Sequence, residues 1–382
     1  MAFINLNHQD ISEIQASVRA AMEPYLAGPQ SSPAAHGAPG DRAAALLERA
    51  REAVGALAGG TPEGVVFTAS GSEAVNLAVK GLAWASETGH RILASPVESL
   101  SVRNAVRFLE GHGFRAEELP ADGAGLVDSE SVRAGLAGGG VALVAVTAAS
   151  GEIGTVEPLA EIGALCEEAA APLVVDAVHA AGRVPLEAES WRAAAVALSA
   201  HTVGGPLGCG ALWLRPRTRL VPLIHGGIQE GGLRGGEENL AGIAGFAEAV
   251  RGVVAALPDR IDRLRRTGAL LRRTLLDPDL GLTPTGHPER RLPGHLSVLA
   301  GGVDGEAVVA GLALRGVAAS TGSSCTRAGL GSRTLTALGV EPALARGALA
   351  FTAGPATRRA EIAAARDALA VVLDGLRRLS PL

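Results

Sequence analysis

A cysteine in a glycine- and serine-rich stretch is the most reactive side chain in the sequence. Cys325 lies in the segment 319–326, and Arg327 follows it two residues later. A nearby cation lowers the pKa of a thiol and favours the nucleophilic thiolate. Cys325 is therefore a candidate reactive thiolate; the alternative is an exposed cysteine without a role. We expect Cys166 and Cys209 to be buried as small hydrophobic side chains.

Polar residues follow three apolar runs that are typical of strands. Ser72 comes after the first run and begins a helical pattern, where free backbone amides can hold a phosphate. Asp176 ends the second run, and Ser199 and His201 follow the third. Such positions form ligand sites in α/β sheets, and His179 and His201 are candidates for acid/base work. The alternative is structural: Ser72 caps a helix, Asp176 bonds to backbone and His201 is satisfied in the core.

The composition narrows the class of protein. The 382 residues are 47% hydrophobic and 19% charged with a net charge of −5, which predicts a folded globular protein without a surface for nucleic acid. Three dispersed cysteines form neither a disulfide framework nor a metal site. The sequence has no signal peptide pattern and no apolar run of about 18 residues. We therefore expect a cytoplasmic protein with no membrane partner and no metal.

Strand-like runs alternate with helical spacing through most of the chain. This alternation predicts a large domain over 13–257, with a mostly parallel sheet, and a smaller α+β domain over 1–12 and 258–382. The predicted strands are 64–68, 91–94, 141–146, 173–176, 195–199, 210–214 and 296–299. The predicted helices are 41–57, 157–169, 238–257, 260–275, 304–314 and 358–379, and the Ala/Gly stretch 134–140 is expected to be a loop.

These segments together resemble the class V aminotransferase fold, and specifically the cysteine desulfurases of the iron–sulfur and nitrogen-fixation type. The motifs that carry the resemblance are 67–81, 151–158, 174–182, 198–212, 224–234 and 319–326. The resemblance implies the type I aminotransferase fold, with a seven-stranded sheet in the large domain, pyridoxal phosphate as cofactor and a homodimer. It also implies that Asp176 faces the pyridine nitrogen and that Cys325 forms a persulfide.

The same alignment of motifs shows correlated departures from the family. The family's functional residues fall on Ser99 (the ring-stacking histidine), Gly151 (the asparagine on the ring oxygen), Thr202 (the Schiff-base lysine), Glu237 (the threonine that reaches the partner's phosphate) and Ala350 (the arginine that binds the substrate carboxylate). Lys80, the only lysine among 34 lysines and arginines, matches a family lysine on the helix after the phosphate turn, so it is not a displaced catalyst.

These departures support the hypothesis that Schiff-base catalysis is lost, with no cofactor held covalently. The protein would then handle sulfur on Cys325, or be a noncatalytic partner of an active desulfurase or a sulfur acceptor. A second hypothesis is an enzyme that binds pyridoxal or pyridoxamine phosphate, or another ligand, noncovalently. In that case Ser72, Asp176, Ser199 and His201 bind the ligand, and His179 and His201 provide the acid and base. A third is a pure interaction module with a vestigial cleft.

Overall fold

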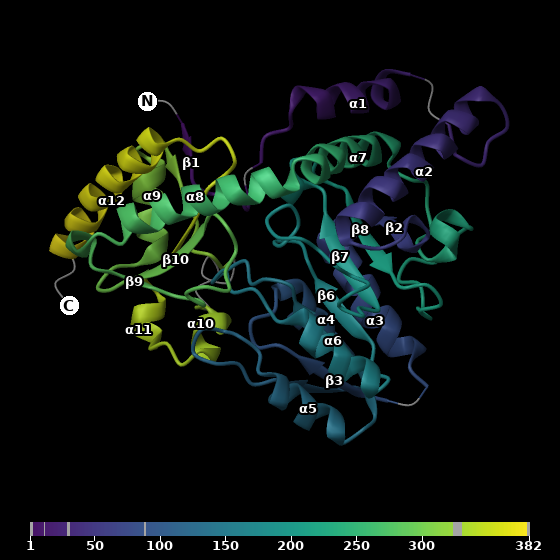
Figure 1. Ribbon diagram of the computed structural model, residues 1–382, viewed down its shortest axis with the longest axis horizontal. Coiled ribbons are helices and arrows are strands. Elements are labelled where there is room, and N and C mark those ends of the chain that lie inside the picture. The colour runs from purple at the N-terminus through teal and green to yellow at the C-terminus, as the bar shows by residue number, and fades with distance from the viewer. Residues whose placement is uncertain (1–2, 11, 29–30, 88, 324–330, 380–382) are drawn as a thin grey trace.

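A seven-stranded sheet forms the centre of the larger part of the molecule (Figure 1). The computed structural model describes residues 3–10, 12–28, 31–87, 89–323 and 331–379. The strand order is β2-β8-β7-β6-β5-β3-β4, and only β8 runs antiparallel to its neighbours within this sheet. The predicted α/β architecture with a mostly parallel sheet is confirmed. The strands are β2 (Val65–Thr68), β3 (Arg91–Ala94), β4 (Arg115–Glu118), β5 (Val141–Thr147), β6 (Leu173–Asp176), β7 (Ala195–Ser199) and β8 (Gly210–Leu214).

Both faces of this sheet are buried because the central strands are apolar throughout. Alternate residues belong to two separate hydrophobic clusters: Val144 and Val175 point to one face, and Leu143 and Val174 to the other. Residues of α1, α2, α5, α6 and α7 join the first cluster, and residues of α3 and α4 join the second. These helices are α1 (Ala16–Ala27), α2 (Ala38–Ala58), α3 (Gly71–Ala85), α4 (Leu100–Glu110), α5 (Ser129–Ala137), α6 (Leu159–Glu168) and α7 (Leu240–Ala255).

The rest of the chain forms a smaller unit around a third hydrophobic cluster, on the far side of the molecule from α2 (Figure 1). Its strands form an antiparallel sheet in the order β12-β10-β9 and a parallel pair, β1 with β11. Leu6 belongs to its core, as expected if the first dozen residues join this unit. The exact domain boundaries stay a prediction. The elements are β1 (Ile4–Asn5), α8 (Leu257–Leu275), β9 (Leu282–Pro284), β10 (His295–Ala300), α9 (Gly305–Ala313), β11 (Val317–Ala318), α10 (Arg333–Ala337), α11 (Pro342–Ala345), β12 (Ala348–Thr352) and α12 (Arg359–Leu379).

No single helix in the described ranges is both long and apolar enough to cross a membrane. Helices α7 and α8 meet that length and composition together, but the chain bends by 77° between them.

The loop predicted over 134–140 is wrong in its first half, because Ala134–Ala137 form the last turn of α5. The Asp128 side chain accepts a hydrogen bond from the Ser131 amide and caps the helix start. Val132 and Leu136, one turn apart, bury one side of the helix. Alanine favours helices, so the Ala/Gly composition concealed a helix whose cap and apolar spacing were present.

The carboxyl group of Glu157, just before α6, is almost completely buried. Its Oε2 accepts a hydrogen bond from the Val127 amide at 2.9 Å, while Oε1 has no partner among the described residues. Burial raises its pKa to about 8; the Val127 amide opposes this shift, Asp122 adds to it and Arg290 opposes it. Because the folded state holds this proton more tightly than the unfolded state, the group loses stabilising effect as pH rises from about 4.5 to about 8.

We predict that Glu157→Gln keeps the Val127 hydrogen bond and removes this titration. Its free energy of unfolding should match the wild type near pH 5 and exceed it at pH 8.5, by on the order of 3 kcal/mol, because each tenfold change in proton affinity is worth about 1.4 kcal/mol. Urea unfolding at both pH values measures the difference. Equal pH dependence in the two proteins would show that Glu157 is not the responsible group; Glu161→Gln, at the start of the same helix, is the matched control.

Candidate functional site

A cavity of about 330 Å³ opens at the carboxyl ends of β6 and β7, beside the start of α3. It brings together the five predicted site residues that the structure describes, although they come from three segments of the sequence. These are Ser72, Asp176, His179, Ser199 and His201. Ser99, one of the departures from the family, lines the same cavity, as does the buried Cys209. The confirmed burial of Cys166 and Cys209 raises the pKa of each thiol to about 12, so neither is a ready thiolate.

One end of the cavity is built to hold an anion. Gly71 and Ser72 form the first turn of α3, whose backbone N–H groups have no partner within the helix. A Cβ at position 71 would lie 2.6 Å from Val178 Cγ2, so only glycine lets this turn approach so closely. Ser199 Oγ and His201 Nδ1, which line the same cavity, are hydrogen-bonded at 2.8 Å. The arrangement suits a phosphate group.

The capping role considered for Ser72 is wrong. Ser70 caps α3, because its Oγ accepts a hydrogen bond from the Glu73 amide at 3.1 Å. The Ser72 hydroxyl instead pairs with the Ser101 hydroxyl at 2.8 Å, and both side chains line the cavity. Ser72 is therefore free of a capping duty and available to a ligand.

Asp176 is buried at the centre of the cavity wall. Its Oδ2 accepts a hydrogen bond from Ser99 Oγ at 2.8 Å, and its Oδ1 accepts one from the Val178 amide at 3.1 Å. Ser99 also caps α4 by accepting a hydrogen bond from the Val102 amide. The serine that replaces an aromatic ring in the family pattern thus holds the aspartate in place.

His179 lies deep between Asp176 and Gly151. Burial lowers its pKa, with Asp176 and Asp10 opposing the shift, so the neutral imidazole is favoured. Its Nδ1 is buried and has no hydrogen-bond partner among the described residues. A Cβ on Gly151 would lie 2.5 Å from His179 Cδ2 and 2.7 Å from Gln9 Nε2. His179 and Gln9 therefore occupy the space that an asparagine at position 151 would need.

No lysine reaches the cleft. The Thr202 hydroxyl donates a hydrogen bond to the Ser199 carbonyl at 3.0 Å, so it is tied to its own backbone turn. The ammonium of Lys80, the only lysine, lies 4.0 Å from the Phe108 ring centroid on the α3–α4 surface and does not line the cavity. Ala350 is buried in β12, where its backbone pairs with Ser320. The positions of the family's lysine and arginine therefore carry no cation.

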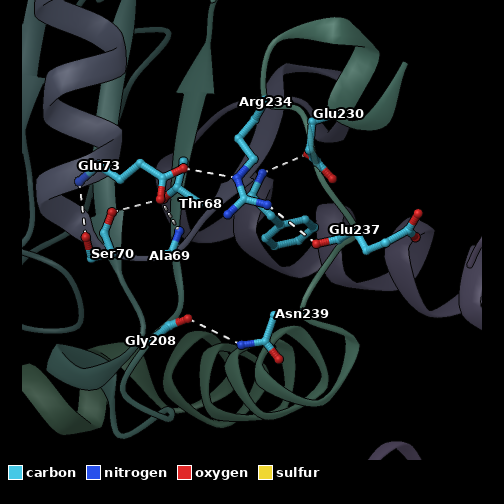
Figure 2. Close-up of polar contacts among 10 residues, drawn as sticks. Thr68, Ala69, Ser70, Glu73, Gly208, Glu230, Arg234, Glu237 and Asn239 are labelled. Carbon is cyan, nitrogen blue, oxygen red and sulfur yellow. Dashed lines mark hydrogen bonds and ion pairs between the residues drawn. The ribbon is translucent and has the colours of Figure 1, made fainter. Parts of the chain in front are cut away.

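The loop 224–239 is tied to the phosphate-type turn from outside. Figure 2 shows Arg234 reaching Glu73, where Nε and Oε1 lie 3.1 Å apart. Glu73 Oε2 in turn accepts a hydrogen bond from the Ala69 amide at 2.9 Å. Glu237 takes part through its backbone carbonyl, 3.5 Å from Arg234 Nη1, while its side chain is exposed. This loop therefore fixes the turn that begins α3.

Glu230 is the buried anchor of the same loop. Its carboxylate accepts two hydrogen bonds from the Arg51 guanidinium and one from the Phe67 amide, each at 2.8 Å. The Glu230 side chain is 1% exposed, and the backbone has a φ of 49° in the left-handed region. Such a conformation costs a non-glycine residue energy and persists only where the surroundings fix it.

Comparison with known proteins gives the class to which this fold and cleft belong. The aminotransferase class-V family model matches residues 5–355. Cysteine desulfurase IscS of Dictyoglomus turgidum is 32% identical, covering 99% of this chain and 96% of its own, and cysteine desulfurase IscS 1 of Archaeoglobus fulgidus is 35% identical, covering 95% and 94%. A solved NifS-like protein is 26% identical, with a TM-score of 0.90 over 98% of this chain and 100% of its own.

The protein has the type I aminotransferase fold and belongs to the aminotransferase class-V family. Within that family it is a homologue of the cysteine desulfurases of the IscS and NifS kind.

Cys325 lies outside the described residues, so its predicted role rests on the sequence. Two further groups that line the cleft were missed by sequence reasoning. Ser101 pairs with Ser72, and Cys209 follows the turn after His201. Ser101 stands two residues after Ser99, at the start of α4, and that helix was not predicted.

We predict that Glu230→Ala lowers the free energy of unfolding by about 3 kcal/mol, because it leaves the Arg51 charge and the Phe67 amide without their buried acceptor. Glu237→Ala removes the same charge from an exposed position of the same loop and should stay within about 0.5 kcal/mol of the wild type. Chemical denaturation of the three proteins measures both effects. A similar loss in both variants would contradict an anchoring role specific to Glu230.

Proposed function

We propose that this protein is a cysteine desulfurase homologue that holds no cofactor covalently and handles sulfur as a noncatalytic member of its family. The observation that supports this most directly is Thr202: its hydroxyl is hydrogen-bonded to the Ser199 carbonyl where the family pattern places the Schiff-base lysine. An amine is required to form that bond, and a hydroxyl cannot replace it.

The cleft fits part of the family's cofactor and lacks the rest. The first-turn amides of α3, with Ser199 and His201, suit its phosphate, and Asp176 suits a protonated ring nitrogen. Position 202 offers no amine, and Ala350 offers no guanidinium for a substrate carboxylate. The residues thus support noncovalent binding of pyridoxal phosphate at most.

Cys325 would be the residue that receives and carries sulfur. Its thiolate would attack the outer sulfur of a persulfide on an active desulfurase. The S–S bond of the donor breaks, a new S–S bond forms on Cys325, and the donor thiolate leaves with the electron pair, so no external oxidant is needed. Cys166 and Cys209 are unsuitable because burial raises the pKa of both thiols.

The proposed partners are a second copy of this chain, an active desulfurase or a sulfur-acceptor protein, in the cytoplasm. Ile228 and Leu207 support a protein partner, because these apolar side chains are 88% and 79% exposed. Leu207 lines the cleft, and Ile228 lies in the loop that anchors the phosphate-type turn. Glu237 would then face the neighbouring subunit.

A second candidate function is noncovalent binding of a phosphorylated ligand, with chemistry of its own. The unpartnered, buried Nδ1 of His179 favours it, since such an atom is rarely left without a hydrogen bond. In this function His179 and His201 hold and move the proton. Burial lowers the pKa of both, so each would act first as a base.

We predict that added pyridoxal phosphate is removed completely from the wild type by gel filtration, because no amine holds it. Thr202→Lys should retain part of it, and borohydride reduction should label the introduced lysine as detected by peptide mass spectrometry. Thr218→Lys, in the loop after β8, is the control for a lysine elsewhere. Reducible attachment to the wild type, at Lys80 or another site, would contradict the proposal.

We predict that incubation with an active cysteine desulfurase and L-cysteine places a persulfide on Cys325. Alkylation and peptide mass spectrometry would detect it, and Cys325→Ser should abolish the signal. Cys209→Ser should leave it unchanged, because that thiol is 2% exposed. An unlabelled Cys325 in the presence of a fully persulfidated donor would remove the carrier role and leave only the noncatalytic partner.

A further inference from the structure

A second, smaller cavity joins the cleft on the side away from the phosphate-type turn. It has a volume of about 120 Å³ and shares Ser99 and His179 with the cleft. Its far wall is formed by Arg103, from α4, and by Arg333, from α10. Two arginines separated by more than two hundred residues of sequence thus line one cavity.

Neither guanidinium is neutralised by an ion pair. No ion pair between described residues includes Arg103 or Arg333. Arg103 Nε donates to the Glu98 carbonyl at 2.9 Å, and its Nη2 donates to the Pro96 carbonyl and, at 3.4 Å, to Thr334 Oγ1. These contacts fix the side chain, whereas Nη1 donates to no described acceptor. Arg333 is exposed and makes no hydrogen bond with a described residue.

Two carboxyl groups, those of Glu98 and Glu152, also line the cavity. Burial raises the pKa of Glu98 well above its ordinary value, with Asp176 adding to the shift, and burial also raises the pKa of Glu152. Burial therefore makes both carboxyl groups easier to protonate, and it lowers the pKa of His179. Glu98 Oε2 is buried without a hydrogen-bond partner among the described residues. A protonated carboxyl group there can donate a hydrogen bond to an anion.

We propose that this cavity binds the carboxylate of a small organic anion between Arg103 and Arg333. A planar carboxylate matches the guanidinium fork, and the two arginines supply charge-assisted hydrogen bonds. The volume suits a molecule of a few heavy atoms, and the larger cleft already has its own phosphate-type end. The site goes beyond the proposed function, because it requires neither a cofactor nor a persulfide.

The proposed cations stand at positions 103 and 333, whereas the family pattern places its arginine at position 350. Ala350 is buried in β12. A Cβ on Gly322 would lie 3.3 Å from the Ala350 Cβ and 3.2 Å from Glu152 Cγ. The backbone at Gly322 therefore packs where a longer side chain at position 350 would begin. The cation is absent there and is provided instead by α4 and α10. An anion bound here would contact the same His179 that closes the phosphate cleft.

Titration calorimetry with sodium propionate at constant ionic strength tests the proposal. We expect saturable binding to the wild type, weakened at least about tenfold in Arg333→Gln and in Arg103→Gln. Arg107→Gln, an exposed arginine one turn further along α4, is the matched control and should bind like the wild type. Because Arg103 also holds backbone carbonyls, the exposed Arg333 gives the decisive variant, and thermal melting confirms that each variant is folded.

Several outcomes would contradict the proposed carboxylate site. They are absence of saturable propionate binding to the wild type, unchanged binding in Arg333→Gln, or an equal loss in Arg107→Gln. A parallel titration with sodium sulfate separates the chemistry: tighter binding of sulfate than of propionate would contradict the carboxylate assignment. Propionate carries neither a phosphate nor a thiol, so these results stay independent of whether the proposed sulfur-handling function holds.

Discussion

The cleft depends on one constraint, which is that strands buried on both faces can present polar groups only where they end. β5, β6 and β7 are parallel and apolar up to their last residue, so Asp176 and Ser199 lie at the same edge of the sheet. β8 runs the opposite way and brings Gly210 against the turn before α3. A Cβ there would lie 2.5 Å from the Ser70 carbonyl carbon, so this glycine permits the turn to close over the sheet edge.

The residues that depart from the family pattern make new local contacts and leave no gaps at the three positions described next. The Ser99 hydroxyl holds Asp176, and the Thr202 hydroxyl bonds to the Ser199 carbonyl. His179 and Gln9 fill the space beside Gly151. Each substitution has a local partner, which argues that the present cleft is a packed arrangement of its own. It also explains how the fold keeps a TM-score of 0.90 to a NifS-like protein while its cleft lacks the family's cations.

Most strands of the sheet could be predicted from the sequence, because long apolar runs are typical of buried strands. Asp176, His179, Ser199 and His201 could be placed at one edge for the same reason. The sequence could not show that Ser70 rather than Ser72 caps α3, because both serines stand at the helix start and the choice depends on backbone geometry. Helix α5 was missed because its alanines and glycine concealed a short amphipathic pattern. Arg103 and Arg333 were missed because only tertiary packing brings α4 and α10 together.

Electrostatics connects the lost cations with the cavity beside the cleft. The family pattern places a lysine at 202 and an arginine at 350, and this chain has neither, yet Asp176, Glu98 and Glu152 remain. Buried carboxylates without cations must either gain hydrogen bonds or gain protons. Asp176 takes the first course, through Ser99 and Val178. Glu98 and Glu152 each accept a hydrogen bond, from the Thr147 amide and the Ser332 hydroxyl, and burial raises the pKa of both.

The groups that line the two cavities determine which ligands these cavities attract. The inner cavity is lined by two arginines, Arg103 and Arg333, and the outer cleft has the first-turn amides of α3. Both cavities therefore offer groups that bind anions, and His179, whose pKa burial lowers, lines both. A ligand that carried an ammonium group would be repelled by both arginines, and Asp176 in the outer cleft is already hydrogen-bonded. The two arginines thus favour a ligand that carries a carboxylate over a cationic one.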